Sequence, residues 1–309
     1  MQVVYLLDVA DRTLQYLNGS RVEEDAIVLD QVCFTPDSSM IVVVFTTSQN
    51  VEVVLEVHSR DAQLLHQIES KTAQADVAVA CLVGNRAVTR TGLHDLTVWD
   101  LSTGQEIRAL NLLEAVLVSS AQVDTVSQPN SRYKCRLCTD PAASKLAGIG
   151  PDGVSVFLFD AVTLQALGYV CPPAGMILSG DRWDDLEMGT SSCLFSAVEG
   201  GMKTSYVCRL AAGTSMLTNS MQISSADWPV LSGDDAFIAY ICREGEATVR
   251  ICDTRSGAMV ATHQIPMLED DDELGPVELV WIGSCLVLTT STFQADLGRS
   301  TDHIIVLQF

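Results

Sequence analysis

Strand-length apolar runs alternate with short polar segments along most of the chain. The stretch 29–69 shows the pattern clearly, and its runs are Leu29–Cys33, Met40–Thr46, Val51–Val57 and Gln63–Ile68. Met40–Thr46 is apolar almost throughout, which is typical of a strand buried on both faces. Thr35–Ser39 supplies the proline, aspartate and serines of a tight turn. The pattern predicts four consecutive antiparallel strands in this stretch.

One pattern recurs: a β-rich run that ends in aspartate and is followed by a turn and a second strand. Its clearest copies are Leu96–Gln105, which contains Asp100, and Thr248–Gly257, which contains Asp253. Weaker copies end at Asp8 and Asp160, while His58, Arg209 and Gln308 occupy the same position in three further runs. The spacing is about 42 to 60 residues, and four-stranded propeller blades repeat at about 40 to 45, so the longer intervals indicate loop insertions.

These repeats predict an all-β fold, a β-propeller of about six or seven four-stranded antiparallel blades with an incomplete blade at each end. The predicted units are approximately 1–20, 29–69, 75–110, 131–170, 190–222, 226–265 and 276–309. The first unit supplies two strands and the last supplies three. Because five strands exceed the four of one blade, the pattern favours the C-terminal part of a longer array over a single closed propeller spanning 1–309.

Trp99-Asp100 at the end of a strand, followed by Leu101-Ser102-Thr103-Gly104, resembles the WD40 repeat. Asp95 and Asp152 resemble the aspartate that this family places between its second and third strands. The resemblance implies that Asp95, Trp99, Asp100, Asp152, Asp160 and Asp253 are repeat-signature positions. Only one unit has the Trp-Asp pair and none has the family's Gly-His, so we expect stability to depend on apolar packing between sheets. The segment Val32–Asp37 is similar to part of the WD region of large NACHT-and-WD-repeat proteins.

The charge and composition of the chain limit the kinds of partner that it can bind. The net charge is −21, with 18 basic against 39 acidic residues, and this disfavours nucleic acid or an anionic membrane as the main partner. The acidic excess fits a solubilising surface or a dock for a basic partner. No apolar run reaches the length of a membrane span, and no secretory signal is recognisable. The ten cysteines are scattered, mostly within apolar runs, which favours a reducing compartment, the cytoplasm.

Candidate chemistry is sparse. The sequence contains no GxSxG, GxxxxGK[ST] or HExxH motif. Cys135 and Cys138 form a CxxC, but they lack a second pair and fall on a predicted strand, where residues three apart point to opposite faces. The acidic run 269–273 lacks the alternating ligands and central glycine of a calcium loop. Asp184, Asp185 and Glu187 could supply carboxylates for glycoside hydrolysis, although a plain acidic surface is the simpler interpretation. We therefore predict no metal, cofactor or catalytic residue.

The predicted function is that of a non-catalytic protein-interaction scaffold. The resemblance adds the expectation of a sensing or autoinhibitory WD region in a NACHT-type signalling protein, acting together with further blades of a longer parent chain. The alternative is a propeller-fold hydrolase or other enzyme with carboxylates at a central channel. The long connections 111–130 and 171–189 are either binding segments or tolerated insertions. Candidate partner-binding residues are Trp183, Asp184, Asp185, Asp270, Asp271 and Asp272.

Overall fold

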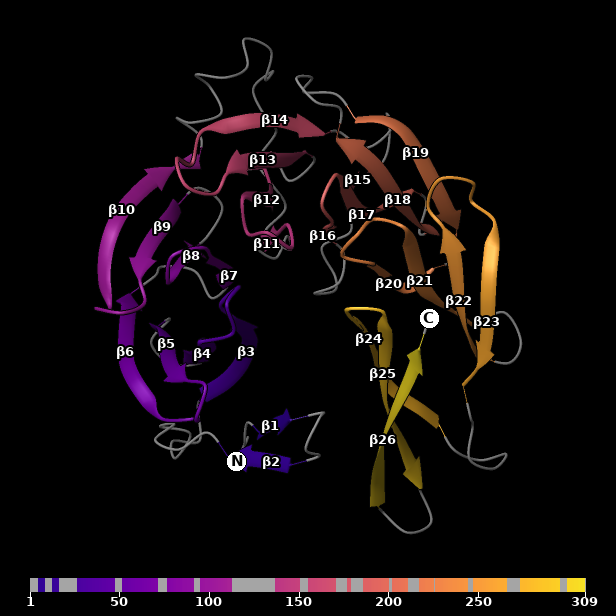
Figure 1. The fold of residues 1–309 in the computed structure, drawn as a ribbon, viewed down its shortest axis with the longest axis horizontal. Helices are drawn as coiled ribbons and strands as arrows, with labels where there is room; N and C mark the ends of the chain where they lie inside the picture. Colours follow the sequence, from indigo (N-terminus) through magenta and orange to yellow (C-terminus); the bar gives the residue numbers. More distant parts are fainter. Residues whose placement is uncertain are drawn as a thin grey trace. The chain divides into compact units, whose positions relative to one another are not determined.

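The computed structural model describes residues 5–8, 13–16, 27–47, 52–71, 77–91, 95–112, 137–150, 155–170, 177–178, 186–199, 202–210, 217–224, 226–243, 247–265, 273–294 and 299–308. The chain divides into two compact units, Met1–Cys171 and Pro172–Phe309, and each is described by itself. The described part of the chain is built of β-strands, and all strand pairs are antiparallel (Figure 1). The all-β, blade-forming fold class predicted from the sequence is confirmed.

Unit 1 contains one two-stranded sheet and three four-stranded sheets among its described residues. The two-stranded sheet pairs β1 (Tyr5–Asp8) with β2 (Thr13–Tyr16). The second sheet consists of β3 (Ile27–Phe34), β4 (Met40–Thr47), β5 (Glu52–Ser59) and β6 (Leu64–Lys71). The third consists of β7 (Val77–Leu82), β8 (Arg86–Thr91), β9 (Asp95–Asp100) and β10 (Gln105–Asn111). The fourth consists of β11 (Leu137–Thr139), β12 (Lys145–Ile149), β13 (Val156–Asp160) and β14 (Ala166–Val170).

Unit 2 contains three sheets in its described part. The first has β15 (Ile177–Leu178) and β16 (Leu186–Met188) on one edge of β17 (Ser192–Glu199), followed by β18 (Met202–Leu210) and β19 (Leu217–Ser224). The second is formed by β20 (Asp227–Leu231), β21 (Phe237–Cys242), β22 (Thr248–Asp253) and β23 (Met259–Gln264). The third has three strands, β24 (Glu273–Ile282), β25 (Cys285–Gln294) and β26 (Arg299–Gln308).

Within each unit the strands at one edge of consecutive sheets lie side by side. In unit 1, β7 lies between β3 and β11, and in unit 2, β20 lies between β16 and β24. Each four-stranded sheet then runs outward from its first strand to its fourth in sequence order. This arrangement is the meander of a propeller blade, in which neighbouring blades meet along their first strands.

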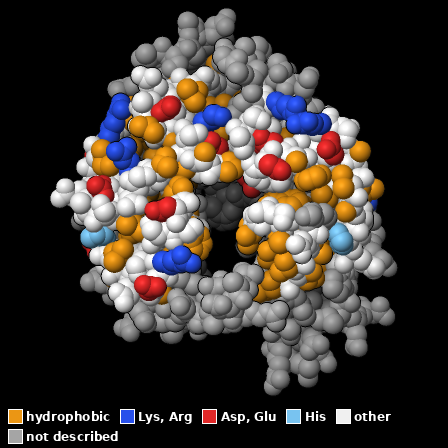
Figure 2. All heavy atoms as spheres, in the orientation of Figure 1, with side chains coloured by type: hydrophobic (Ala, Val, Ile, Leu, Met, Phe, Trp, Pro, Cys, Tyr) orange, Lys and Arg blue, Asp and Glu red, His pale blue; other side chains and the backbone are white. Residues whose placement is uncertain are grey.

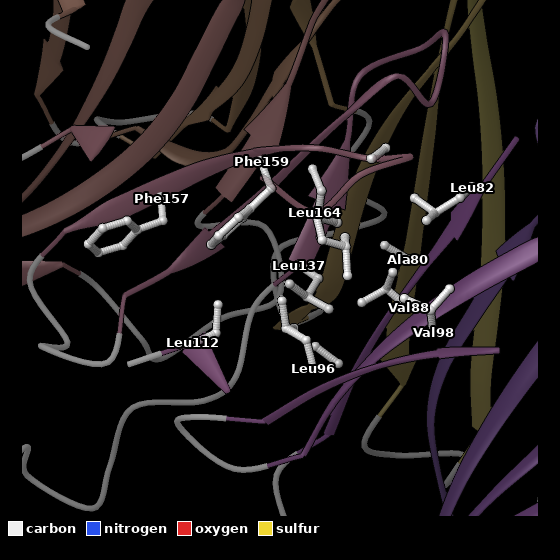
Figure 3. Packing of buried hydrophobic residues seen from close by; sticks show 13 residues of the cluster. Ala80, Leu82, Val88, Leu96, Val98, Leu112, Leu137, Phe157, Phe159 and Leu164 are labelled. Carbon is white, nitrogen blue, oxygen red and sulfur yellow. The ribbon is translucent and has the colours of Figure 1, made fainter. Parts of the chain in front are cut away.

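Apolar clusters join each sheet to the next. In unit 1, Val88 and Leu96 of one sheet pack with Leu146 and Phe159 of the following sheet, and all four are 0–1% exposed (Figure 3). Residues of the opposite parity in the β7–β10 sheet, such as Cys81, pack against the β3–β6 sheet. A strand alternates its side chains between two faces, so this sheet is buried on both sides. Unit 2 repeats the arrangement around β20–β23.

Two details differ from the sequence prediction. The stretch 171–189 was expected to be a long connection, and its described residues contribute β15 and β16, which pair with β17. Asp95, expected in a turn, is the first residue of β9. The two N-terminal and three C-terminal strands occur as predicted, and their assignment to a closed ring or a longer array remains a prediction.

Candidate interaction surface

Three third strands end in an aspartate that caps the turn to the fourth strand: β9 at Asp100, β13 at Asp160 and β22 at Asp253. Asp160 Oδ1 accepts hydrogen bonds from the backbone N–H groups of Val162 and Thr163, at 3.0 and 2.7 Å, and from Thr163 Oγ1 at 2.9 Å. The other two caps follow the same plan, with donors from Ser102 and Thr103, and from Arg255 and Ser256. The signature aspartates therefore hold their own turns.

These hydrogen bonds also keep the carboxylates ionised. The Ser102 hydroxyl and backbone N–H lower the pKa of Asp100 below its usual value of 3.8. The backbone N–H and hydroxyl of Thr163 do the same to the pKa of Asp160. The corresponding groups of Ser256 lower the pKa of Asp253. A carboxylate that accepts several hydrogen bonds is stabilised in its charged form, so these side chains are committed acceptors and not proton donors.

The turn between the first and second strands repeats a second arrangement. Thr35 Oγ1 donates to Asp37 Oδ1 at 2.7 Å and accepts from the N–H of Met40 at 2.9 Å. In unit 2, the Ser232 hydroxyl makes the same pair of bonds to Asp234 and Phe237, at 2.7 and 2.8 Å. The fourth residue of each turn has positive φ, 56° at Ser38 and 62° at Asp235. Both units therefore use the same turn conformation with the same hydrogen bonds.

The two kinds of turn lie at the same end of their sheet and are joined to each other. The N–H of Ala161 donates to the carbonyl of Ser144 at 2.9 Å, and the N–H of Thr254 donates to that of Ala236 at 3.0 Å. We call these joined turns the turn edge of a sheet. Side chains on it are displayed outward, with Val162 62% exposed. Each turn edge is a fixed backbone platform that exposes polar and apolar side chains to solvent.

In unit 1, fourth strands brace the turn edge of the next sheet. His66 on β6 hydrogen-bonds through Nε2 to the carbonyl of Ser102 at 2.7 Å, and Arg108 on β10 donates to the carbonyl of Thr163 at 3.1 Å. Sequence reasoning missed both braces. The signal is that each residue lies eight positions after the aspartate or its substitute, since His66 follows His58 and Arg108 follows Asp100 at that spacing.

Unit 2 holds its first two turn regions together through carboxylates. Glu187 Oε2 accepts the N–H of Leu231 at 2.6 Å. Asp235 Oδ2 accepts the N–H and hydroxyl of Ser191 at 2.6 and 2.8 Å. Gly189 lies so close that a Cβ there would be 1.7 Å from Asp235 Oδ1. Glu187, a candidate acid for glycoside chemistry, therefore has a structural role in joining consecutive sheets.

The remaining predicted residues divide into two groups. Trp99 packs against the apolar cluster between the β3–β6 and β7–β10 sheets and donates from Nε1 to Thr89 Oγ1 at 2.8 Å, which makes it structural. Asp95 is exposed and accepts from Asn111 Nδ2 at 3.4 Å. The others lie outside the described residues: Asp152, Trp183, Asp184, Asp185, Asp270, Asp271 and Asp272.

Other titratable groups do not form a reaction centre in the part of the chain that the structure describes. His58 and Glu56 are almost fully buried on β5 and lie 3.1 Å apart through Nε2 and Oε2. No group of three or more His, Cys, Asp or Glu side chains among the described residues is placed to hold a metal ion. No helix in the described ranges is long and apolar enough to cross a membrane.

One apolar face in unit 2 is exposed. The β24–β26 sheet packs Leu279, Leu286 and Leu288 against the β20–β23 sheet. Its opposite face carries a second set of apolar side chains, and Figure 2 shows such side chains gathered over this sheet. The members of that set that are more than half exposed are Val280, Ile282, Ile304 and Val306.

Comparisons with known proteins agree on the fold. No protein-family profile and no curated protein matches the sequence. Among solved structures, a prolyl endopeptidase aligns with a TM-score of 0.60 at 12% identity, over 99% of this chain and 46% of that chain. Kuenenia stuttgartiensis hydrazine synthase aligns with a TM-score of 0.57 at 14% identity, over 92% and 82%. The C-terminal WD40 domain of Sif2 aligns with a TM-score of 0.52 at 11% identity, over 96% and 75%. These likenesses support the β-propeller fold class.

Proposed function

We propose that this chain is a non-catalytic protein-interaction scaffold of the WD40 type. The turn edges carry the proposal, because each uses its aspartate to fix its own backbone and leaves neighbouring side chains such as Val162 exposed. A surface whose backbone is already ordered loses less conformational freedom when a partner binds. Loops and turns displayed on a rigid scaffold are where binding residues concentrate.

The resemblance of the segment Val32–Asp37 to the WD region of NACHT-and-WD-repeat proteins supports a narrower role. The segment's residues Thr35 and Asp37 build the first-to-second-strand turn of the β3–β6 sheet. We propose that the chain is the sensing or autoinhibitory WD region of a NACHT-type signalling protein in the cytoplasm. Cys81, Cys193, Cys208, Cys242 and Cys252 are buried free thiols, which is consistent with a reducing compartment.

The direct test is quantitative affinity enrichment with the full chain as bait. Val162→Lys alters a turn edge, whereas Leu167→Lys, which changes a 51% exposed side chain of β14, is the matched control. We expect Val162→Lys to reduce enrichment of at least one saturable partner at least tenfold, and Leu167→Lys to leave it unchanged. Equal enrichment by both variants would contradict docking at the turn edges. Melting curves of both variants verify folding.

A second pair of variants tests the predicted binding segments. Trp183→Ala, and replacement of Asp270, Asp271 and Asp272 by Asn, should weaken partner binding more than they lower the melting temperature. A large fall in melting temperature for Trp183→Ala would instead identify that side chain as part of the core.

The alternative is a propeller enzyme, and the fold likeness to a prolyl endopeptidase is the observation that favours it. It predicts turnover of a peptide, ester or glycoside in a broad hydrolase panel, with loss of turnover when a channel carboxylate is replaced. Turnover together with no recovered partner would overturn the scaffold proposal.

A further inference from the structure

Two cysteines from neighbouring sheets of unit 1 face each other. Cys33 lies on β3 and Cys81 lies on β7, and their Sγ atoms are 3.0 Å apart. The two residues are 48 positions apart in sequence. The contact therefore depends on the packing of one sheet against the next and not on local chain geometry.

The backbone around the pair is held by a second link between the same strands. Two residues before Cys33, the side-chain amide of Gln31 donates to the carbonyl of Val79 at 2.8 Å and accepts the N–H of Val79 at 2.9 Å. Val79 is in turn two residues before Cys81. Side chains two apart on a strand share a face, so the amide bridge sets β3 and β7 in the relative position that brings the thiols together.

We propose that Cys33 and Cys81 form a redox-active dithiol, which a low-molecular-weight disulfide such as glutathione disulfide converts into a disulfide that cross-links the two sheets. A disulfide bond is about 2.0 Å long, so closure requires the sulfur atoms to approach by about 1 Å. This site is independent of the proposed scaffold function.

The solvent exposure of the two thiols determines which of them reacts first with glutathione disulfide. Cys33 is partly exposed, whereas Cys81 is 5% exposed. The Cys33 thiolate attacks one sulfur of glutathione disulfide, forming a mixed disulfide and releasing one glutathione. The Cys81 thiolate then attacks Cys33 Sγ, forming the protein disulfide and releasing the second glutathione. Two protein thiols lose two electrons to the oxidant, and their protons end on the two released glutathione thiols.

The contact between the two sulfur atoms, and not the acidity of its thiol, suits Cys81 to the second step. Its hydrogen bond with Cys33 and its burial raise the pKa of the Cys81 thiol well above its usual value. It therefore remains a thiol until the mixed disulfide forms beside it. Attack at close range compensates for a small thiolate fraction, because the two sulfurs are already in contact.

A second cysteine pair in unit 2 provides an internal comparison. Cys193 and Cys208 are register partners on β17 and β18, and both are buried. Burial raises the pKa of Cys208 to about 12 and raises that of Cys193 as well. Neither thiol offers an exposed sulfur for a soluble disulfide to attack, so we expect both to stay reduced where Cys33 and Cys81 oxidise.

The test equilibrates the full chain in glutathione buffers of graded redox ratio, quenches with acid and alkylates the remaining thiols. Cleavage after arginine and lysine places Cys33 alone in peptide 22–60 and Cys81 alone in peptide 72–86. We expect these two peptides to become linked, with the loss of two hydrogen atoms, and to separate on reduction. Separate alkylated peptides at every ratio, or links to other cysteines instead, would overturn the proposal.

Single variants distinguish the order of steps. Cys81→Ser should leave Cys33 carrying one glutathione, whereas Cys33→Ser should leave Cys81 reduced and slow to alkylate in the native protein. Cys285→Ser, at a partly exposed cysteine in unit 2, is the control and should leave the Cys33–Cys81 link unchanged. The opposite labelling pattern in the two variants would overturn the assigned order. The peptide map of the unaltered chain tests the cross-link even if a variant fails to fold.

Discussion

Replacing Phe159 by alanine tests the packing that joins consecutive sheets. Phe159 is 1% exposed, and its ring centroid lies 6.5 Å from that of Phe157 within the cluster shared by the β7–β10 and β11–β14 sheets. Removing a fully buried phenylalanine side chain loses about 1.5–3 kcal/mol of transfer free energy. The cavity that remains brings the usual total to about 3–5 kcal/mol. We expect a loss of unfolding free energy in that range.

The assay is denaturant unfolding followed by circular dichroism, with Val162→Ala as the surface control. Because Val162 is 62% exposed, that change should alter stability by no more than about 0.5 kcal/mol. A loss below about 1 kcal/mol for Phe159→Ala would refute the assignment of this ring to the core.

A double-mutant cycle shows whether the cluster is shared between sheets. Val88 and Val57 are both 0% exposed, but only Val88 lies in the Phe159 cluster, whereas Val57 lies in the cluster with the preceding sheet. Combining Phe159→Ala with Val88→Ala should give a coupling energy of about 0.5–3 kcal/mol. Combining it with Val57→Ala should be additive within about 0.5 kcal/mol. A coupling energy near zero for both double mutants would contradict packing across the two sheets.

Two further predictions concern the turns. Gly189→Ala should lower unfolding free energy by about 1–3 kcal/mol, because its Cβ would collide with Asp235 Oδ1; an unchanged melting temperature would show that the two turns do not touch. The pKa values of Asp100, Asp160 and Asp253 are lowered in the folded protein. Their contribution to the free energy of unfolding is therefore complete above pH 3.8, the ordinary pKa of aspartate, and is lost as the pH falls through the lower pKa of the folded protein. Asparagine at all three positions should therefore flatten the acid-side loss of stability in a pH titration of unfolding, and an unchanged slope would contradict the capping role.

Much of the fold could be predicted because its determinants are local. The apolar run at 40–46 and the turn at 35–39 identify β4 and its boundary without any knowledge of neighbours. The aspartate caps are local too, since the carboxylate of Asp160 accepts hydrogen bonds from donors two and three residues ahead. The matching spacing of Thr35 and Asp37 with Ser232 and Asp234 could also have revealed the second turn arrangement, which the sequence interpretation treated only as turn chemistry.

The contacts between sheets could not be predicted in this way. The Gln31 amide meets Val79, and Glu187 meets Leu231, across 48 and 44 residues respectively. Nothing in the sequence around Gln31 or Glu187 distinguishes these residues from polar residues on a solvent-exposed surface. Glu56 and His58 are likewise buried side by side on β5, and a single run of residues does not show that burial. Such contacts are set by which sheets become neighbours.

The most direct test of the scaffold function combines partner capture with the turn-edge variant. The full chain, Val162→Lys and Leu167→Lys are each titrated against the same enriched partner, and binding is measured by calorimetry. The account predicts saturable binding by the full chain, at least tenfold weaker binding by Val162→Lys and unchanged binding by Leu167→Lys. Equal binding by all three proteins would contradict a scaffold that docks its partners at the turn edges.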